Sequence, residues 1–215
     1  MNKSELNDLN LIRSDKLLTP AELIAKLPIT SVIEQTVING RNQIRKILDG
    51  EDSRFIMLVG PCSIHDEKAA LEYAIKLKEI SDPFKDKFLT IMRVYFEKPR
   101  TTVGWTGFLY DPNLDDSFNM AQGLFKGRKL LLDLANKGIY CATEILDPFV
   151  PQYIADLISW AAIGARTTES QVHRELVSGL SMPVGFKNGT DGNLKITDGN
   201  LKIAIDAIKS ASNKH

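Results

Sequence analysis

The chain has 215 residues, of which 43% are hydrophobic and 25% are charged, and its 27 Lys and Arg residues balance its 27 Asp and Glu residues. These proportions are typical of a soluble globular protein and exclude a disordered, collagen-like or disulfide-rich chain. No apolar run approaches the ~18 residues of a membrane span, and the polar N-terminus is unlike a signal peptide. Cys62 and Cys141 are expected to be thiols in a reducing, cytoplasmic compartment.

Residues 1–50 are predicted to form a helical extension before the main fold. The segment 19–22 (Thr-Pro-Ala-Glu) marks a helix start, because its Thr can cap the helix, its Pro suits the first helical position and its Glu can complete a capping box. A longer helix is predicted over residues 31–48, and Gly50 is its expected stop.

From Arg54 onward, apolar runs alternate with amphipathic segments. The run at residues 55–59 is apolar without alternation, which indicates a strand buried on both faces. The predicted strands are residues 55–59, 88–94, 140–142, 160–164 and 183–186, and the predicted helices cover residues 66–81, 118–137, a segment ending at 158, 170–180 and 201–212. This order predicts a parallel sheet with right-handed crossovers, either as an open doubly wound sheet or as a (β/α)8 barrel. No glycine-rich phosphate-binding loop follows a strand, which weakens the nucleotide-binding interpretations.

Polar side chains gather where the predicted strands end. Glu144 is the nearby anion, and the cations at these positions are Arg93, Lys98, Arg100, Arg166 and Lys187. In barrels the chemistry lies at the carboxyl ends of the strands. Clustered cations are costly unless anions compensate them, so the pattern indicates a ligand with phosphate and carboxylate groups. Trp105, in a long loop over residues 96–117, either closes over this mouth or packs, and Cys141 is expected in the core.

Four longer motifs lie at or just after the predicted strands. They are GPCSIH at residues 60–65, MRVYFEKPRTTVGW at 92–105, IGARTTESQ at 163–171 and PVGFKNGTDG at 183–192. Together they resemble the feedback-regulated class I 3-deoxy-D-arabino-heptulosonate 7-phosphate (DAHP) synthases of microbes. The resemblance implies a (β/α)8 TIM barrel with an N-terminal extension. It also implies an enzyme that joins phosphoenolpyruvate, erythrose 4-phosphate and water into DAHP and phosphate, the first step of the shikimate pathway to the aromatic amino acids.

The resemblance also implies roles for residues within these motifs. Phosphoenolpyruvate would be bound by Arg93, Gly164, Ala165, Arg166 and Lys187, with the two backbone amides at Gly164 and Ala165 facing its phosphate. Arg100 and Thr101 would hold the phosphate of erythrose 4-phosphate, and Lys98, between the two substrates, would donate the proton. Cys62 matches one ligand of a divalent metal ion such as Mn²⁺ or Fe²⁺.

Regulation and assembly are implied by the same family. Its members are inhibited by an aromatic amino acid, bound near the N-terminal extension, and full-length members form homo-oligomers. Residues 1–50 are therefore expected to be an oligomerisation and regulatory arm, and residues 51–215 the catalytic part. A neutral chain without a basic stripe or a membrane span is expected to have small-molecule partners, with neither nucleic acid nor a membrane among them.

Two features depart from the family pattern. A complete barrel has eight units in roughly 250 residues, and residues 51–215 hold about five at that spacing. The resemblance places a further arginine and the other metal ligands, a His, a Glu and an Asp, beyond residue 215. We therefore expect the chain alone to be weakly active or inactive, with open edges at its first and fifth strands. The heptapeptide TDGNLKI also occurs twice, at residues 190–196 and 197–203, which indicates a tandem duplication that lengthens the fifth helix or loops out beside Lys187.

Two other functions are open on the sequence. Lys187, at a predicted strand end, could form an imine with a carbonyl substrate, as in a Schiff-base aldolase. The chain could instead be non-catalytic, binding phosphate or joining intact subunits through residues 1–50.

Overall fold

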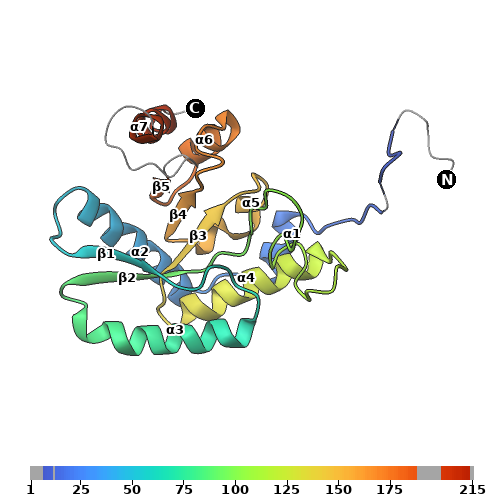
Figure 1. Cartoon of the computed structure of the whole chain (residues 1–215). Helices are drawn as coiled ribbons and strands as arrows, with labels where there is room; N and C mark the ends of the chain where they lie inside the picture. The colour runs from blue at the N-terminus through green and yellow to red at the C-terminus, as the bar shows by residue number, and fades with distance from the viewer. Residues whose placement is uncertain (1–6, 12, 188–199, 214–215) are drawn as a thin grey trace.

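One parallel sheet forms the centre of the structure, a computed structural model that describes residues 7–11, 13–187 and 200–213. Its five strands lie side by side in chain order: β1 (Phe55–Val59), β2 (Phe88–Arg93), β3 (Cys141–Ile145), β4 (Trp160–Ile163) and β5 (Val184–Phe186). The strand direction changes steadily across the sheet, so that the sheet curls as part of a barrel (Figure 1).

The strand order decides between the two predicted architectures. A doubly wound sheet reverses its strand order at a switch point, which places helices on both faces. Here the order β1-β2-β3-β4-β5 contains no reversal. The doubly wound alternative is therefore wrong for the described residues, and the prediction of an incomplete (β/α)8 barrel with about five units is confirmed.

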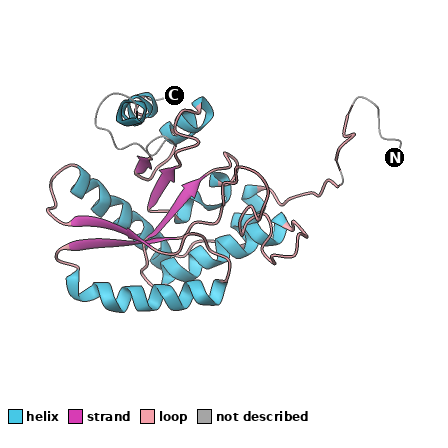
Figure 2. Cartoon of the chain, in the orientation of Figure 1, coloured by secondary structure: helices cyan, strands magenta, loops and turns pink. Residues whose placement is uncertain are grey.

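Helices and strands alternate along the chain (Figure 2). The helices that follow the strands are α3 (Glu67–Ser81), α4 (Met120–Asn136), α5 (Pro151–Ile154), α6 (Gln171–Ser178) and α7 (Asn200–Ala211), with 3-10 turns at η1 (Asp82–Phe84) and η2 (Ala155–Leu157). The helix α4 begins two residues later than predicted, because Phe118 has a left-handed backbone (φ 48°) and the Asn119 side chain caps the helix. The helix predicted to end at residue 158 is a single α turn followed by η2.

The N-terminal extension consists of α1 (Pro20–Lys26) and α2 (Ser31–Leu48). The predicted capping box is present, because Glu22 N donates to Thr19 Oγ1 at 3.2 Å and Thr19 N donates to Glu22 Oε2 at 2.8 Å. Arg41 Nε donates to the Ile158 carbonyl at 2.9 Å, and Arg45 donates to the Ser181 carbonyl at 2.5 Å. Both carbonyls precede strands, so α2 covers the starting end of the sheet and leaves the carboxyl ends free.

Alternate residues of β2 enter two different hydrophobic clusters. Leu89 and Ile91 pack with Ile44 of α2 and Ala142 of β3. Met92 belongs instead to the main core, which contains the buried leucines of α4, among them Leu124, Leu130, Leu131 and Leu134. The period of two therefore places one face of the strand against the extension and the other against the outer helices.

Both ends of the sheet are open within the described residues, as predicted. β1 pairs with β2 alone and β5 pairs with β4 alone. On β1, Phe55 is 72% exposed, which is unusual for a strand of a parallel sheet. The sequence prediction of a strand buried on both faces is therefore wrong for β1, none of whose residues is fully buried in this structure.

Two further predictions have simple outcomes. Among the described residues, no helix is long and apolar enough to cross a membrane. The prediction that the duplicated heptapeptide lengthens the fifth helix or loops out concerns residues 190–199, which lie outside the described residues. The end of its second copy lies within α7.

Candidate functional site

The predicted site residues converge at the carboxyl ends of the strands. Cys62 follows β1, Arg93 ends β2, and Lys98, Arg100 and Thr101 lie in the loop after β2; Gly164, Ala165 and Arg166 follow β4, and Lys187 follows β5. Parallel strands end on the same side of a sheet, so one mouth collects all of these groups, as in other barrels. Glu144 differs slightly from the prediction, since β3 is longer than expected and contains it.

Cys62 and Lys98 lie in direct contact at this mouth. Lys98 Nζ donates to Cys62 Sγ at 2.6 Å, and the Arg93 guanidinium donates to the Cys62 carbonyl at 3.3 Å. The hydrogen bond from Lys98 and the nearby charges of Lys98, Arg93 and Arg100 hold the pKa of the Cys62 thiol below its usual value. The thiolate form of Cys62, which is the form that reacts or binds metal, is therefore favoured here.

Glu144 and Lys187 form an ion pair across the mouth. Lys187 Nζ donates to Glu144 Oε2, and the Glu144 side chain is 10% exposed. A Cβ atom at Gly164 would overlap Glu144 Oε1, so a larger residue there would displace this carboxylate. The carbonyl of Lys187 accepts from Thr168 Oγ1 at 2.8 Å, which ties the loops after β4 and β5 together.

The loop after β2 is held by its own hydrogen bonds. Arg100 Nε donates to the Trp105 carbonyl at 2.8 Å, and Arg166 contacts Thr101 Oγ1 at 3.5 Å. The indole of Trp105 donates to the Asp111 carbonyl at 2.8 Å and packs against the main core. Of the two expectations for Trp105, this geometry fits packing.

Most of the predicted cations lack a carboxylate partner. Lys187 pairs with Glu144, whereas no carboxylate in the described part of the chain lies within ion-pair distance of the remaining four, Arg93, Lys98, Arg100 and Arg166. Uncompensated cations at one mouth attract anions, and guanidinium groups match carboxylate and phosphate oxygens. The mouth is therefore suited to an anionic ligand.

Glu97 is a site residue that sequence reasoning missed. Its carboxylate is 4% exposed and accepts from Tyr110 Oη at 2.8 Å, Asp147 N at 2.9 Å and Leu146 N at 3.1 Å. Burial raises the pKa of Glu97 to about 7, against the lowering effect of these hydrogen bonds. Glu97 thus clamps the loop that carries Lys98 to the loop after β3. Its place beside Lys98 in the motif was the signal available in the sequence.

His173 is a second residue that the sequence left unassigned. Its ring nitrogens lie 2.8 Å from Ser170 Oγ and 2.7 Å from the Leu146 carbonyl, and the residue is buried. Both nitrogens are satisfied by these partners, so His173 links the loop after β3 to α6 and does not point a free nitrogen into the mouth.

The described residues do not by themselves fit a divalent metal site. No group of three or more His, Cys, Asp or Glu side chains in the described ranges is arranged to hold a metal ion. The polar side chain in contact with Cys62 is the ammonium of Lys98, which cannot ligate. A site of the expected kind would need ligands in addition to Cys62.

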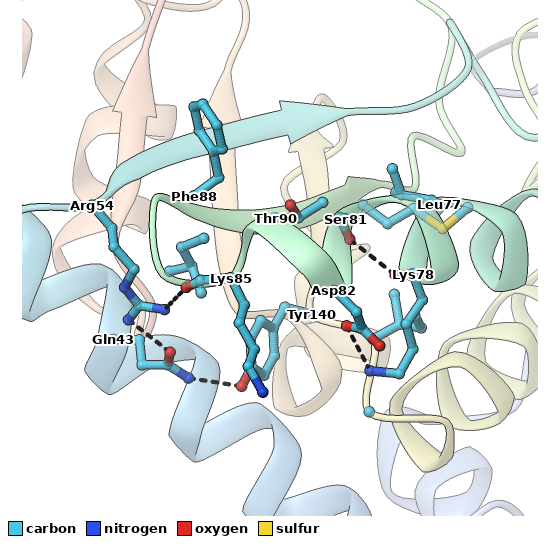
Figure 3. A pocket seen from close by; sticks show the side chains of 14 residues that line it. Gln43, Arg54, Leu77, Lys78, Ser81, Asp82, Lys85, Phe88, Thr90 and Tyr140 are labelled. Carbon is cyan, nitrogen blue, oxygen red and sulfur yellow. Dashed lines mark hydrogen bonds and ion pairs between the residues drawn. The ribbon is translucent and has the colours of Figure 1, made fainter.

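A separate cleft of about 260 Å³ lies at the starting end of the strands (Figure 3). Phe88 and Thr90 of β2 line it, together with Gln43 of α2. Gln43 donates to Tyr140 Oη at 2.7 Å and accepts from the Arg54 guanidinium at 2.9 Å. These polar groups satisfy one another at the end of the sheet opposite the predicted site residues, so the mouth is the stronger candidate.

The fold and the mouth together define a class of protein, the (β/α) barrels with clustered cations at the carboxyl ends of their strands. A sequence model of the DAHP synthetase I family matches residues 29–215. The chain belongs to the DAHP synthetase I family.

Similar proteins are named phospho-2-dehydro-3-deoxyheptonate aldolases. The chain is 54% identical over 209 residues to the Trp-sensitive phospho-2-dehydro-3-deoxyheptonate aldolase of Buchnera aphidicola (97% of this chain, 58% of the relative). It is equally identical, over the same shares, to the Phe-sensitive enzyme of Escherichia coli K12. A solved phospho-2-dehydro-3-deoxyheptonate aldolase from Francisella tularensis has a TM-score of 0.90 and 52% identity, with coverage of 96% of this chain and 58% of that chain. The chain therefore spans about 58% of the length of these relatives.

Proposed function

We propose that this chain provides the substrate-binding mouth of a DAHP synthase, which condenses phosphoenolpyruvate with erythrose 4-phosphate. The observation that carries the proposal is the group of four cations at the strand ends that have no carboxylate partner among the described residues. The names of the relatives, all phospho-2-dehydro-3-deoxyheptonate aldolases, support the same reaction.

Phosphoenolpyruvate carries a phosphate and a carboxylate, which suits the cations from β2, β4 and β5. We assign its binding to Arg93, Arg166 and Lys187, with the backbone amides of Gly164 and Ala165 donating to the phosphate. The proximity of Arg166 to Thr101, at 3.5 Å, supports a second phosphate subsite beside the first. We assign that subsite, for erythrose 4-phosphate, to Arg100 and Thr101.

In the proposed reaction, the C3 carbon of phosphoenolpyruvate attacks the aldehyde carbon of erythrose 4-phosphate. Lys98 would give a proton to the aldehyde oxygen as it becomes a hydroxyl group. Water would add at the C2 carbon, which has become electron-poor, and inorganic phosphate would leave. Holding both anionic substrates in one mouth converts their encounter into an intramolecular reaction, which is the main contribution of the arginines.

The proposal includes a divalent metal ion, because the family resemblance implies one. When bound, such an ion would polarise the aldehyde oxygen as a Lewis acid. Cys62 would be its ligand from this chain, and additional ligands would be required. The described residues do not complete the site of such an ion.

Regulation, assembly and location are proposed from the relatives. Their names describe Trp-, Phe- and Tyr-sensitive enzymes, so we propose an aromatic amino acid as feedback inhibitor. We propose residues 1–50 as the arm for assembly of like subunits and for regulation, residues 51–215 as the catalytic part, and the cytoplasm as its location. Small anions are the proposed partners, rather than nucleic acid or membrane.

The ion pair of Lys187 with Glu144 argues against the alternative of a Schiff-base aldolase. The Glu144 carboxylate engages Lys187 Nζ, the atom that would have to attack a carbonyl carbon. Borohydride trapping of a sugar phosphate on Lys187 would revive that alternative. The non-catalytic alternative predicts binding of phosphoenolpyruvate without turnover.

Calorimetric titration with phosphoenolpyruvate and an assay with both substrates and Mn²⁺ test the proposal together. We expect binding by the 215-residue chain, loss of binding in Arg166→Met, and unchanged binding in Arg13→Met. Arg13 is a matched control, since its side chain is 60% exposed and pairs with Asp15, far along the chain from the mouth residues. Absence of binding would overturn the proposed mouth, and full turnover would overturn the expectation of a weak or inactive chain.

A further inference from the structure

Tyr95 lies beside two of the cations assigned to phosphoenolpyruvate. The centroid of its ring is 4.1 Å from the guanidinium carbon of Arg93 and 5.3 Å from Lys187 Nζ. Both distances are within the ~6 Å range of cation–π attraction. Arg93 lies at the end of β2 and Lys187 follows β5. A single ring therefore contacts cations from two strands that are not neighbours in the sheet.

The ring of Tyr95 can hold two cations close together without occupying their N–H groups, which carboxylates cannot do. Arg93 and Lys187 repel one another, and within the described part of the chain only Lys187 of the two has an ion-pair partner, Glu144. A carboxylate beside Arg93 would hold it in place but would also occupy the N–H groups needed for a ligand. An aromatic face attracts the cation while leaving those N–H groups free to donate.

Arg93 depends on this ring more than a typical arginine would. Its Nε atom is buried and has no hydrogen-bond acceptor among the described residues. Its hydrogen bond to the Cys62 carbonyl, at 3.3 Å, is a long contact. The ring of Tyr95 is therefore the principal feature that fixes the guanidinium group.

Tyr95 is itself firmly held. The residue is 7% exposed, and its carbonyl accepts from Ile64 N at 2.7 Å, which ties it to the loop that carries Cys62. Burial raises the pKa of the Tyr95 hydroxyl, so the ring stays neutral and does not become a competing anion. The position of the ring is thus set before any ligand arrives.

We propose that Tyr95 is a positioning residue for the phosphoenolpyruvate subsite, whose ring holds the Arg93 guanidinium and the Lys187 ammonium in place through cation–π contacts so that their N–H groups can donate to the ligand. This inference rests on the proposed function. It adds a residue that acts through Arg93 and Lys187 and does not itself contact the ligand.

The test compares Tyr95→Phe, which keeps the ring, with Tyr95→Leu, which removes it. The first readout needs no ligand: the Nε–H proton of Arg93, recorded by ¹⁵N NMR, is expected upfield because of the ring current. Its burial should slow its exchange with water, and Arg93→Lys assigns the signal. We expect the upfield position in wild type and Tyr95→Phe and its loss in Tyr95→Leu.

The second readout is the affinity for phosphoenolpyruvate, measured by calorimetry. We expect Tyr95→Phe to bind within about twofold of wild type and Tyr95→Leu to bind about tenfold more weakly, as the loss of cation–π contacts predicts. Pentafluorophenylalanine at position 95 keeps the ring shape and reverses the sign of its face, so it should weaken binding as Leu does. This variant decides the question if Tyr95→Leu fails to fold.

The outcomes separate the inference from the function on which it rests. An Arg93 signal that is unchanged in Tyr95→Leu overturns the inference, and so does equal affinity of the Phe and pentafluorophenylalanine variants. If wild type does not bind phosphoenolpyruvate, the proposed function is overturned. In that case an Arg93 signal that moves in Tyr95→Leu still supports the placement of this cation by Tyr95.

Discussion

Lys98 Nζ lies 2.6 Å from Cys62 Sγ, although the two residues are 36 positions apart in the chain. The contact joins the loop after β1 to the loop after β2 and gives the mouth a thiol with a lowered pKa. Cys141, the other cysteine, is fully buried and burial raises its pKa to about 12. The two thiols should therefore differ strongly in reactivity.

Metal-free protein at pH 7.5 should be alkylated by iodoacetamide at Cys62 and not at Cys141. Lys98→Met should slow the reaction at Cys62, because the hydrogen bond that favours the thiolate is removed. Peptide mass spectrometry over time gives both rates in one sample. Equal rates in wild type and Lys98→Met would contradict the assigned contact, and Lys26→Met, on α1, is the control for a general effect of charge.

Gly164→Ala should weaken the binding of phosphoenolpyruvate. The added Cβ would overlap Glu144 Oε1, so the carboxylate must move and the ion pair with Lys187 must shift. Gly179→Ala is the matched control, because a Cβ there meets only the Leu176 carbonyl at 3.6 Å. Calorimetry should show a loss of affinity for the first variant and none for the second; equal affinities would show that the Gly164 contact is unimportant.

Glu97 should make stability depend on pH. Its folded pKa of about 7 lies above the unfolded value of 4.5, so between these values the folded state binds more protons than the unfolded state. Glu97 therefore lowers the free energy of unfolding as pH rises from about 4.5 to about 7, by at most about 3 kcal/mol. Above that range its contribution is constant.

Glu97→Gln should remove this part of the pH dependence, since Gln does not titrate. Urea unfolding midpoints at pH 5 and pH 8 measure it in both proteins. Wild type should lose more stability than Glu97→Gln over this interval, whatever their absolute difference from the changed hydrogen bonds to Leu146 and Asp147. Parallel pH profiles would show that Glu97 keeps an ordinary pKa in the folded state.

Arg128 should be essential for stability. It is fully buried, pairs with the Asp156 carboxylate at 2.7 and 2.8 Å, and donates to the carbonyls of Leu27 and Tyr153. Arg128→Met should reduce the free energy of unfolding by about 3–5 kcal/mol, because it leaves these acceptors unpaired. Lys129→Met removes an exposed pair with Asp133 on the same helix and should cost less than about 1 kcal/mol. Similar costs for the two variants, in urea unfolding, would contradict this role.

The alternation of strands and helices was predictable because it is a local property. The apolar run of β2 and the cap of α1 at Thr19 are both recorded in neighbouring residues, and both appear in the structure. The length of β3 was not predictable in this way. Thr143 and Glu144 are polar, and the strand continues through them because they pair with Ala161 and Ala162 of β4. Lys187, 43 residues beyond Glu144, pairs with the buried carboxylate.

The candidate site also has some features that neighbouring residues predict and others that depend on distant residues. The cations and their places after strands follow from sequence, since parallel strands end on one side of a sheet. The structure adds Tyr95 and Glu97, whose partners are distant in the chain: Lys187 lies over the ring of Tyr95, and Leu146 and Asp147 donate to Glu97. A sequence motif can include such residues without saying what they contact.

The sequence alone therefore determined the fold class, the family and the residue types that meet at the mouth. Hydrophobic periodicity and short motifs are local patterns, which can be read from residues close together in the chain. The tertiary structure decided which cations are paired, which carboxylate is buried and how far β3 extends. These properties depend on distances between segments far apart in the chain, and electrostatic and desolvation energies change steeply with those distances.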